Sequence, residues 1–376
     1  MNLDTVKALF KKRANEIATG AHDKTGVFDA YLSDKRIPVA PPEDIIDENG
    51  KAVFGTFDRE FQKMSFTKIH KQSCLPDFTN PIRYTRWEAT EVNFDDVLFL
   101  TAVCNMGIIG VALTLVYDKE TEELLAWKEM MLPQWAVISE TLLNKDETYS
   151  KGFMNKILYK NDFGNGKAYV SGNAKSKSGK VNYDLELTRV SLPSVVSIPF
   201  GENKPLYSQK DHFTVKGYLE VNGKRYEASK NTTAIIDDHR GYYPYNSHYD
   251  WVTTMGRRTF DGKEQYFAFN LTRNQSINQD DFNENLIWFE GETTRLTPVY
   301  FKHLEYNKWH ITDDHGMVDV IFDIGDRYLM KLNIGIINMD YHITFGKISG
   351  YVCDPSGYKY DLDGMYGIGE DKSLRI

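Results

Sequence analysis

Polar and apolar residues alternate along much of the chain, as in strands that have one buried and one solvated face. The run 181–188 alternates strictly, and Phe213 and Val215 begin a second run with its apolar residues on one face. That second run leads into Asn222-Gly223, which suits the positive φ angles of a two-residue hairpin turn. This part of the chain therefore predicts an antiparallel hairpin.

Turn sequences of the same kind separate other strand-like runs. They are Asp47–Gly50, Asp261-Gly262, Asp314–Gly316 and Pro355–Gly357. The apolar runs 97–103 and 108–116 are rich in β-branched residues and predict two paired interior strands. Long helical patterns between strands are missing, which argues against a nucleotide-binding α/β fold. The pattern predicts an all-β protein of antiparallel sandwiches or barrels.

The first twenty residues have a different pattern. Leu3, Val6, Phe10 and Ile17 recur near helical spacing and predict one short amphipathic helix. The segment lacks the uninterrupted apolar stretch of a secretory signal or a membrane span, so we expect a cytoplasmic protein. Attachment of this helix to a membrane surface is the weaker alternative.

Chain length, charge and cysteine content limit the possible domain organisation and partners. A chain of 376 residues is long for one core, so we expect two packed units. The 53 acidic and 45 basic side chains are interspersed, and no basic stripe suggests a nucleic-acid partner. Three separated cysteines predict no disulfide framework and are expected to be buried.

Motifs for common cofactors are missing from the sequence. We find no phosphate-binding glycine loop, no Gly-x-Ser-x-Gly and no His-Glu-x-x-His. His303, His310 and His315 do not have the spacing of a known ligand set. We therefore expect neither a cofactor nor a metal ion.

The segment 237–251 is the main candidate site. It combines three acids, two histidines, one arginine and five aromatic residues. Gly241 and Pro244 predict a loop, and loops on rigid sheets often carry binding sites. The hypothesis is that Asp238 orients or exchanges protons with His239, as in general acid–base catalysis.

Further residues of this segment are predicted to bind the ligand. They are Arg240, Tyr243, Tyr245, His248 and Trp251, with Arg240 at a polar end and the rings around an apolar cavity. In the alternative interpretation, Asp238 and Arg240 form a structural ion pair and the tyrosines cover a barrel end.

A second cluster, Arg83 to Glu88, has the composition of a polar strand. Arg83 and Trp87 are four residues apart, so one strand face would bring cation and ring together. We include both among the predicted ligand-binding residues. An ordinary strand with a salt bridge between Arg86 and Glu88 is the alternative.

These clusters, in order, resemble a bacterial family known as domain of unknown function 2804. The similar segments are Ile45–Gly50, Arg83–Glu88, Val116–Asp118, Arg240–Tyr245 with Trp251, Phe269–Leu271, Asn283–Asn285 and Gly346–Gly350. The family is distantly similar to carotenoid hydratases and AttH-like proteins. In that wider group an Asp-His element lies near the junction of two β units, and Asp238-His239 resembles it.

The resemblance implies two lipocalin-like β units. We place them at 41–240 and 241–376, after the short N-terminal helix and arm (1–40), because the strand before the 237–251 segment is expected to finish the first unit. The resemblance also implies a pocket for a hydrophobic small molecule, with hydration, isomerisation or cyclisation that needs no redox cofactor. The alternatives are a carbohydrate-binding or carbohydrate-processing β-sandwich, with Tyr242, Tyr245 and Trp288 stacked on sugars, and a non-catalytic interaction module. Nothing in the sequence determines the oligomeric state.

Overall fold

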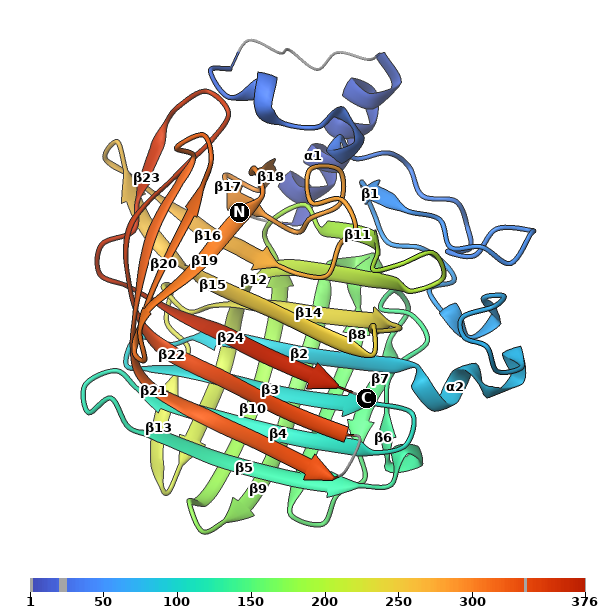
Figure 1. The fold of residues 1–376 in the computed structure, drawn as a ribbon. Helices are drawn as coiled ribbons and strands as arrows, with labels where there is room; N and C mark the ends of the chain where they lie inside the picture. The colour runs from blue at the N-terminus through green and yellow to red at the C-terminus, as the bar shows by residue number, and fades with distance from the viewer. Residues whose placement is uncertain (1–2, 20–25, 335–336, 376) are drawn as a thin grey trace.

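The computed structural model describes residues 3–19, 26–334 and 337–375. Two large antiparallel sheets make up most of the protein, and the N-terminal helix lies at one end of them (Figure 1). The helices of the described residues are α1 (Leu3–Thr19), the single turn α2 (Asn80–Arg83), and the short 3-10 helices η1 (Asp29–Tyr31), η2 (Asp34–Arg36), η3 (Phe66–Lys68), η4 (Asp77–Thr79), η5 (Pro133–Trp135) and η6 (Phe163–Asn165).

Strands β1 to β14 form the first sheet. They are β1 (Gly55–Phe57), β2 (Thr85–Asn93), β3 (Val97–Asn105), β4 (Gly110–Asp118), β5 (Leu124–Met131), β6 (Ala136–Val137), β7 (Asp146–Ser150), β8 (Asn155–Asp162), β9 (Lys167–Ser176), β10 (Gly179–Arg189), β11 (Ser194–Pro199), β12 (Pro205–Val221), β13 (Lys224–Glu227) and β14 (Thr233–Gly241). Its main path is β5-β4-β3-β2-β14-β12-β10-β9-β8-β7-β6. The two ends of the path approach each other, since β3 and β4 contact β6 and β8. The sheet is therefore a nearly closed barrel.

Strands β15 to β24 form the second sheet. They are β15 (Asn246–Phe260), β16 (Lys263–Arg273), β17 (Leu286–Phe289), β18 (Glu292–Arg295), β19 (Val299–Glu305), β20 (Lys308–Asp313), β21 (Val318–Ile334), β22 (Ile337–Cys353), β23 (Lys359–Asp361) and β24 (Met365–Arg375). Its main path is β18-β17-β16-β15-β24-β22-β21-β20-β19. This sheet curls into a half-barrel, in which β19 contacts β16.

The predicted strands follow from alternation and turn chemistry. In β10 every second side chain is buried, as the run 181–188 predicts. Asn222 and Asp261 take positive φ angles of 52° and 50° at the tips of their hairpins. The predicted all-β class and the predicted hairpins at these positions are confirmed.

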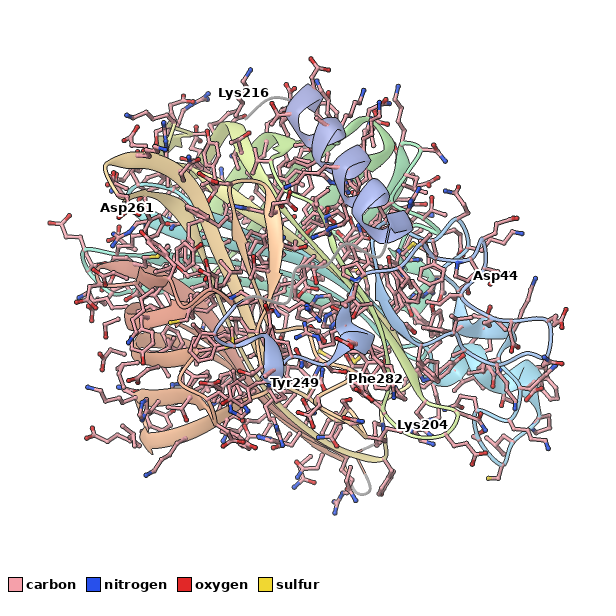
Figure 2. The ribbon with its side chains drawn as sticks, turned by 90° about the horizontal axis from the view of Figure 1, so that it is seen from above. Asp44, Lys204, Lys216, Tyr249, Asp261 and Phe282 are labelled. Atoms are coloured by element: carbon pink, nitrogen blue, oxygen red, sulfur yellow. The ribbon has the colours of Figure 1, made fainter. Side chains whose placement is uncertain are left out.

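Each sheet has its own core, and a third core joins them. Phe99, Tyr159 and Leu185 belong to the cluster that fills the barrel. The outer faces of the two sheets pack together, with Tyr117 stacked on Phe345 at a centroid distance of 5.6 Å. Seen from above, side chains crowd the space between and around both sheets (Figure 2). The first sheet ends at β14 and the second begins at β15; that each folds as a separate unit stays a prediction.

Two local predictions need correction. The segment 237–251 is mostly strand, and only residues 242–245 connect β14 to β15. Cys74 is exposed although we expected buried cysteines, and all three cysteines are free.

The predicted N-terminal helix is confirmed and Val6 is buried, while the side chains of Leu3 and Ile17 lie outside the described residues. No described helix has both the length and the apolar character needed to cross a membrane.

Candidate functional site

Strand β14 divides the predicted catalytic segment between two faces. Asp238 and Arg240 point into the barrel, where Nε and Nη2 of Arg240 donate to the two Asp238 carboxylate oxygens at 2.6 and 2.8 Å. Arg240 also donates to the carbonyl of Ser139 at 2.7 Å. The predicted pairing of Asp238 with His239 is not formed, because neighbouring strand residues point to opposite faces. Asp238 and Arg240 instead form the structural ion pair of the alternative interpretation.

The buried carboxyl of Glu88 lies next to this ion pair, and its protonation should make the stability of the protein depend on pH. Burial, then the charge of Asp238, raises the pKa of Glu88 to about 7, above its unfolded value. The folded state then holds a proton that the unfolded state has lost, so stability falls as pH rises from about 4.5 to 7. We expect Glu88→Gln to remove about 3 kcal/mol of this fall, measured as urea unfolding at pH 5 and pH 8. Equal pH slopes for both proteins would contradict the assignment.

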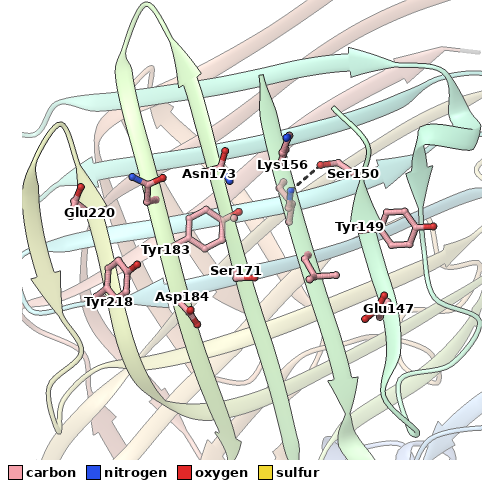
Figure 3. A pocket seen from close by; sticks show the side chains of 14 residues that line it. Glu147, Tyr149, Ser150, Lys156, Ser171, Asn173, Tyr183, Asp184, Tyr218 and Glu220 are labelled. Carbon is pink, nitrogen blue, oxygen red and sulfur yellow. Dashed lines mark hydrogen bonds between the residues drawn. The ribbon is translucent and has the colours of Figure 1, made fainter. Parts of the chain in front are cut away.

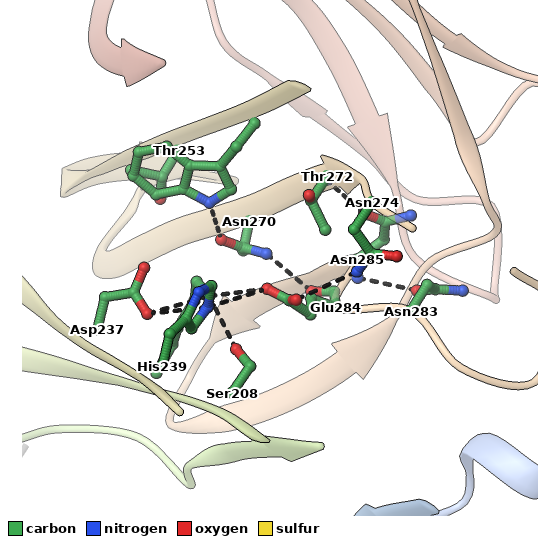
Figure 4. Close-up of polar contacts among 12 residues, drawn as sticks. Ser208, Asp237, His239, Thr253, Asn270, Thr272, Asn274, Asn283, Glu284 and Asn285 are labelled. Carbon is green, nitrogen blue, oxygen red and sulfur yellow. Dashed lines mark hydrogen bonds and ion pairs between the residues drawn. The ribbon is translucent and has the colours of Figure 1, made fainter. Parts of the chain in front are cut away.

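The other face of β14 carries charged residues toward the second sheet. Lys210 of β12, Asp237 and His239 of β14, and Glu284 form what we call the inter-sheet cluster. Figure 4 labels its Asp237, His239 and Glu284. The Lys210 ammonium lies 2.8 Å from Glu284 Oε2, 2.8 Å from His239 Nε2 and 3.2 Å from Asp237 Oδ1. Lys210, Asp237 and Glu284 are 0%, 4% and 2% exposed, so these charges depend on one another.

Mutual pairing sets the protonation of Lys210 and Glu284. Burial alone would raise the pKa of Glu284, but the Lys210 charge, with His239, lowers it well below its usual range. Burial likewise opposes the charge of Lys210, yet Asp237 and Glu284 raise its pKa overall. Glu284 and Lys210 are therefore ionised at neutral pH.

A small cavity of about 30 Å³ lies against the inter-sheet cluster. Its lining is Thr85, Trp87, Cys104, Phe200, Leu206, Asp237, His239, Tyr243, Tyr249, Trp251, Thr272, Asn274, Glu284, Glu370 and Lys372. Charged groups stand among the rings of this lining, and its accessible surface is mostly apolar. Such a volume holds about a water molecule or two.

Aromatic rings from both sheets surround the ammonium of Lys372. This group lies 4.6 Å from the ring centre of Tyr341, 5.7 Å from Tyr249, 5.9 Å from Trp87 and 6.0 Å from Tyr243. We call these four rings the aromatic cage. Rings at such distances attract a cation through their negative faces.

Glu370 of β24 supplies an acid at the same cavity. Burial raises its pKa, although the Tyr341 hydroxyl, the Lys372 charge and the Tyr249 hydroxyl act in the opposite direction. Tyr249 donates to Oε2 at 2.8 Å, and Tyr341 donates to Oε1. The cavity thus has two carboxyl groups whose pKa values move apart, Glu370 upward and Glu284 downward.

The structure brings together some of the predicted site residues. Trp87, His239, Tyr243 and Trp251 line the cavity. Tyr245 is 47% exposed, and Arg240 lies inside the barrel. His248 lies on the other face of β15 from Trp251, next to Asp250.

Arg83 does not lie over Trp87 as predicted. It is in the turn α2, before β2 begins, and donates to the carbonyl of Tyr243 at 3.3 Å. The cation near Trp87 is Lys372, from the far end of the sequence. The predicted pairing fails because the two residues do not belong to one strand.

Sequence reasoning missed Lys210, Asp237, Glu284, Glu370 and Lys372 as site residues. One signal was available at 208–212, where five polar residues interrupt an otherwise half-apolar strand. Polar residues buried in the middle of a strand need partners and therefore mark a polar site. The partner Glu284 lies in the segment Asn283–Asn285, which we used only for the family resemblance.

Two of the three rings that the carbohydrate alternative would stack on sugars are buried. Tyr242 and Trp288 are 1% and 0% exposed, so neither can stack on a sugar. A separate open groove of about 610 Å³ lies over β7 to β10 and β12 (Figure 3). Tyr149 and Tyr218 lie on opposite sides of this groove, and the ring of Tyr183 between them is only 2% exposed, so the three rings do not offer a continuous stacking surface.

Comparisons with known proteins place the chain in a family. A kievitone hydratase from Nectria haematococca has a similar structure, with 11% identity, a TM-score of 0.42, and coverage of 77% of this chain and 88% of that one. A protein assigned as AttH from Nitrosomonas europaea shows 12% identity, a TM-score of 0.40, and coverage of 79% and 93%. At these values nothing about ligand or reaction transfers, and no curated protein matches the sequence. The family model of a domain of unknown function (DUF2804) matches residues 36–376, so the chain belongs to the DUF2804 family, as the sequence predicts.

Proposed function

We propose that this protein binds a small organic molecule in the cavity between the two sheets. Its apolar body would lie against the aromatic cage, and its polar end would reach His239 and Glu370. The observation that carries this proposal is that three rings of the aromatic cage, Trp87, Tyr243 and Tyr249, line one cavity together with buried acids and bases. Small-molecule sites typically combine aromatic walls with a few polar groups.

The size of the cavity requires Lys372 to move when a ligand enters. Its side chain is partly exposed, and no carboxylate of the described residues forms an ion pair with its ammonium. A lysine has a flexible stem, so its side chain can turn toward solvent at a modest cost. Its departure would open the faces of the aromatic cage to the ligand.

Proton transfer on the bound molecule is the second candidate function. The opposite pKa shifts of Glu370 and Glu284 favour it, since such pairs commonly divide the acid and base roles. Glu370 would donate a proton and the ionised Glu284 would accept one, in hydration, isomerisation or cyclisation. Asp238 does not reach the cavity, so we assign the acid role to Glu370 instead.

Two variants test the binding proposal. Lys372→Ala should tighten binding about two- to five-fold, because the ligand no longer displaces a cation worth roughly 0.5–1 kcal/mol in the cage. His239→Gln should weaken binding about five-fold through a lost hydrogen bond. We would screen fatty acids, isoprenoids and aromatic polyketides by native mass spectrometry, and then measure affinities by tryptophan fluorescence.

Lys359→Ala is the matched control. Lys359 lies 3.7 Å from the ring centre of Tyr351, away from the cavity, so its removal should leave affinity unchanged. A protein that carries no compound from its own host and ignores the whole panel would refute the binding function. Equal effects of Lys372→Ala and Lys359→Ala would refute the role of the cage.

A further inference from the structure

Two imidazoles and two carboxylates form a closed ring at one end of the second sheet. His248 and Asp250 come from β15, His303 from β19 and Asp371 from β24. His303 Nε2 lies 2.9 Å from one Asp250 oxygen, and His248 Nε2 lies 3.2 Å from the other. The second nitrogen of each ring faces Asp371, at 3.8 Å from His248 and 3.9 Å from His303.

The two carboxylates of this ring lie directly opposite each other. Asp250 and Asp371 are partners in the register of β15 and β24, so their side chains share one face. Like charges in this position destabilise a sheet, and Asp250 is only 7% exposed. Such an arrangement needs positive charge placed between the two carboxylates.

We propose that His248, Asp250, His303 and Asp371 bind one divalent transition-metal ion, for which Zn²⁺ is the suitable probe. Zinc bonds of about 2.0–2.2 Å place neighbouring ligand atoms of a tetrahedron about 3.3 Å apart. The Nε2 atoms of His303 and His248 lie 2.9 and 3.2 Å from the Asp250 oxygens, near that value. Asp371 faces Nδ1 of each ring, at 3.8 and 3.9 Å, so its carboxylate would turn toward the ion on binding. One ligand atom each from His248, Asp250 and Asp371 already lies within 4.8 Å of the others.

Neighbouring residues hold the two imidazoles in place. His303 stacks on Trp309 with a centroid distance of 4.8 Å and an interplanar angle of 12°. Ser373 Oγ lies 3.0 Å from His248 Nδ1, which leaves Nε2 of that ring for the ion. Ligating histidines usually have their second nitrogen fixed by such a partner.

The position of β19 gives the ion a structural role. This strand ends the hydrogen-bonded path of the sheet, and four strands separate it from β15 along that path. The curl of the half-barrel nevertheless brings His303 to Asp250. A bound ion would join β19 to β15 and β24 and stabilise the curl, because it binds the folded state alone.

Zinc titration of the untagged full chain tests the proposal after chelator treatment and dialysis. We expect one Zn²⁺ per chain, a rise in melting temperature, and the visible d–d absorption band of tetrahedral Co²⁺ when Co²⁺ replaces Zn²⁺. His303→Gln and Asp371→Asn should each weaken Zn²⁺ binding at least about ten-fold and remove the rise in melting temperature. Circular dichroism confirms that each variant is folded.

His310→Gln is the matched control on the neighbouring strand. His310 also pairs with one aspartate, with Nε2 at 2.8 Å from Asp319 Oδ1, but it belongs to no ring of four groups. Its replacement should leave Zn²⁺ affinity unchanged. The proposal is overturned if excess Zn²⁺ does not bind, or if binding survives both His303→Gln and Asp371→Asn.

Discussion

Replacing Arg240 with methionine is expected to lower the free energy of unfolding by about 3–5 kcal/mol, because it leaves the Asp238 carboxylate buried without its partner. Asp238 is 0% exposed and receives two hydrogen bonds from this guanidinium. Arg240 also donates to the Ser139 and Glu140 carbonyls, which would lose their partner. Urea unfolding at pH 7 measures the loss.

A surface pair with the same spacing serves as the control. Arg225 pairs with Glu227 two residues away, as Arg240 pairs with Asp238, but both side chains are largely exposed. Arg225→Met should change stability by less than about 1 kcal/mol. The double variant Asp238→Leu with Arg240→Met should regain much of the lost stability, because it removes both charges. Equal effects of Arg225→Met and Arg240→Met would disprove the buried pair.

Replacing Lys210 with methionine should be similarly costly, about 3–5 kcal/mol at neutral pH. The change removes the cation from the inter-sheet cluster and leaves Asp237 and Glu284 facing each other across it. Lys160→Met is the control, because Lys160 pairs with Glu147 at 3.7 Å on an exposed surface. Adding Glu284→Gln to Lys210→Met should recover part of the stability.

The cost of Lys210→Met should depend on pH. In the native protein the pKa of Glu284 is lowered, so its contribution is present above the unfolded pKa and is lost as pH falls. Without Lys210, burial raises the pKa of this carboxyl and favours its neutral form. The difference between the two proteins should therefore shrink as pH falls through the raised pKa of Glu284 in the variant, which lies above the ordinary value of about 4.5. A constant difference from pH 7 to pH 4 would rule out the assigned pairing.

Predictions that depend on neighbouring residues agree with the structure, and predictions that depend on side-chain partners agree less well. The hairpin at Asn222-Gly223 and the alternation in β10 follow from local geometry, and both are present. The segment 237–251 attracted notice for its composition, but Gly241 and Pro244 suggested a longer loop than residues 242–245. That error hid the alternation of β14, which separates Asp238 from His239.

The amino-acid sequence alone was enough for the all-β class, the positions of the hairpins and membership of the DUF2804 family. The class and the hairpins depend on the two-residue period of a strand and on turn residues, which act over a few positions, whereas the family was identified from the order of its similar segments. Only the tertiary structure showed which residues are partners at the two proposed sites. Lys210 and Glu284 are 74 residues apart, and His303 and Asp250 are 53 apart. Curling and packing of whole sheets bring such groups together, and no short stretch of sequence encodes the register in which two distant surfaces meet.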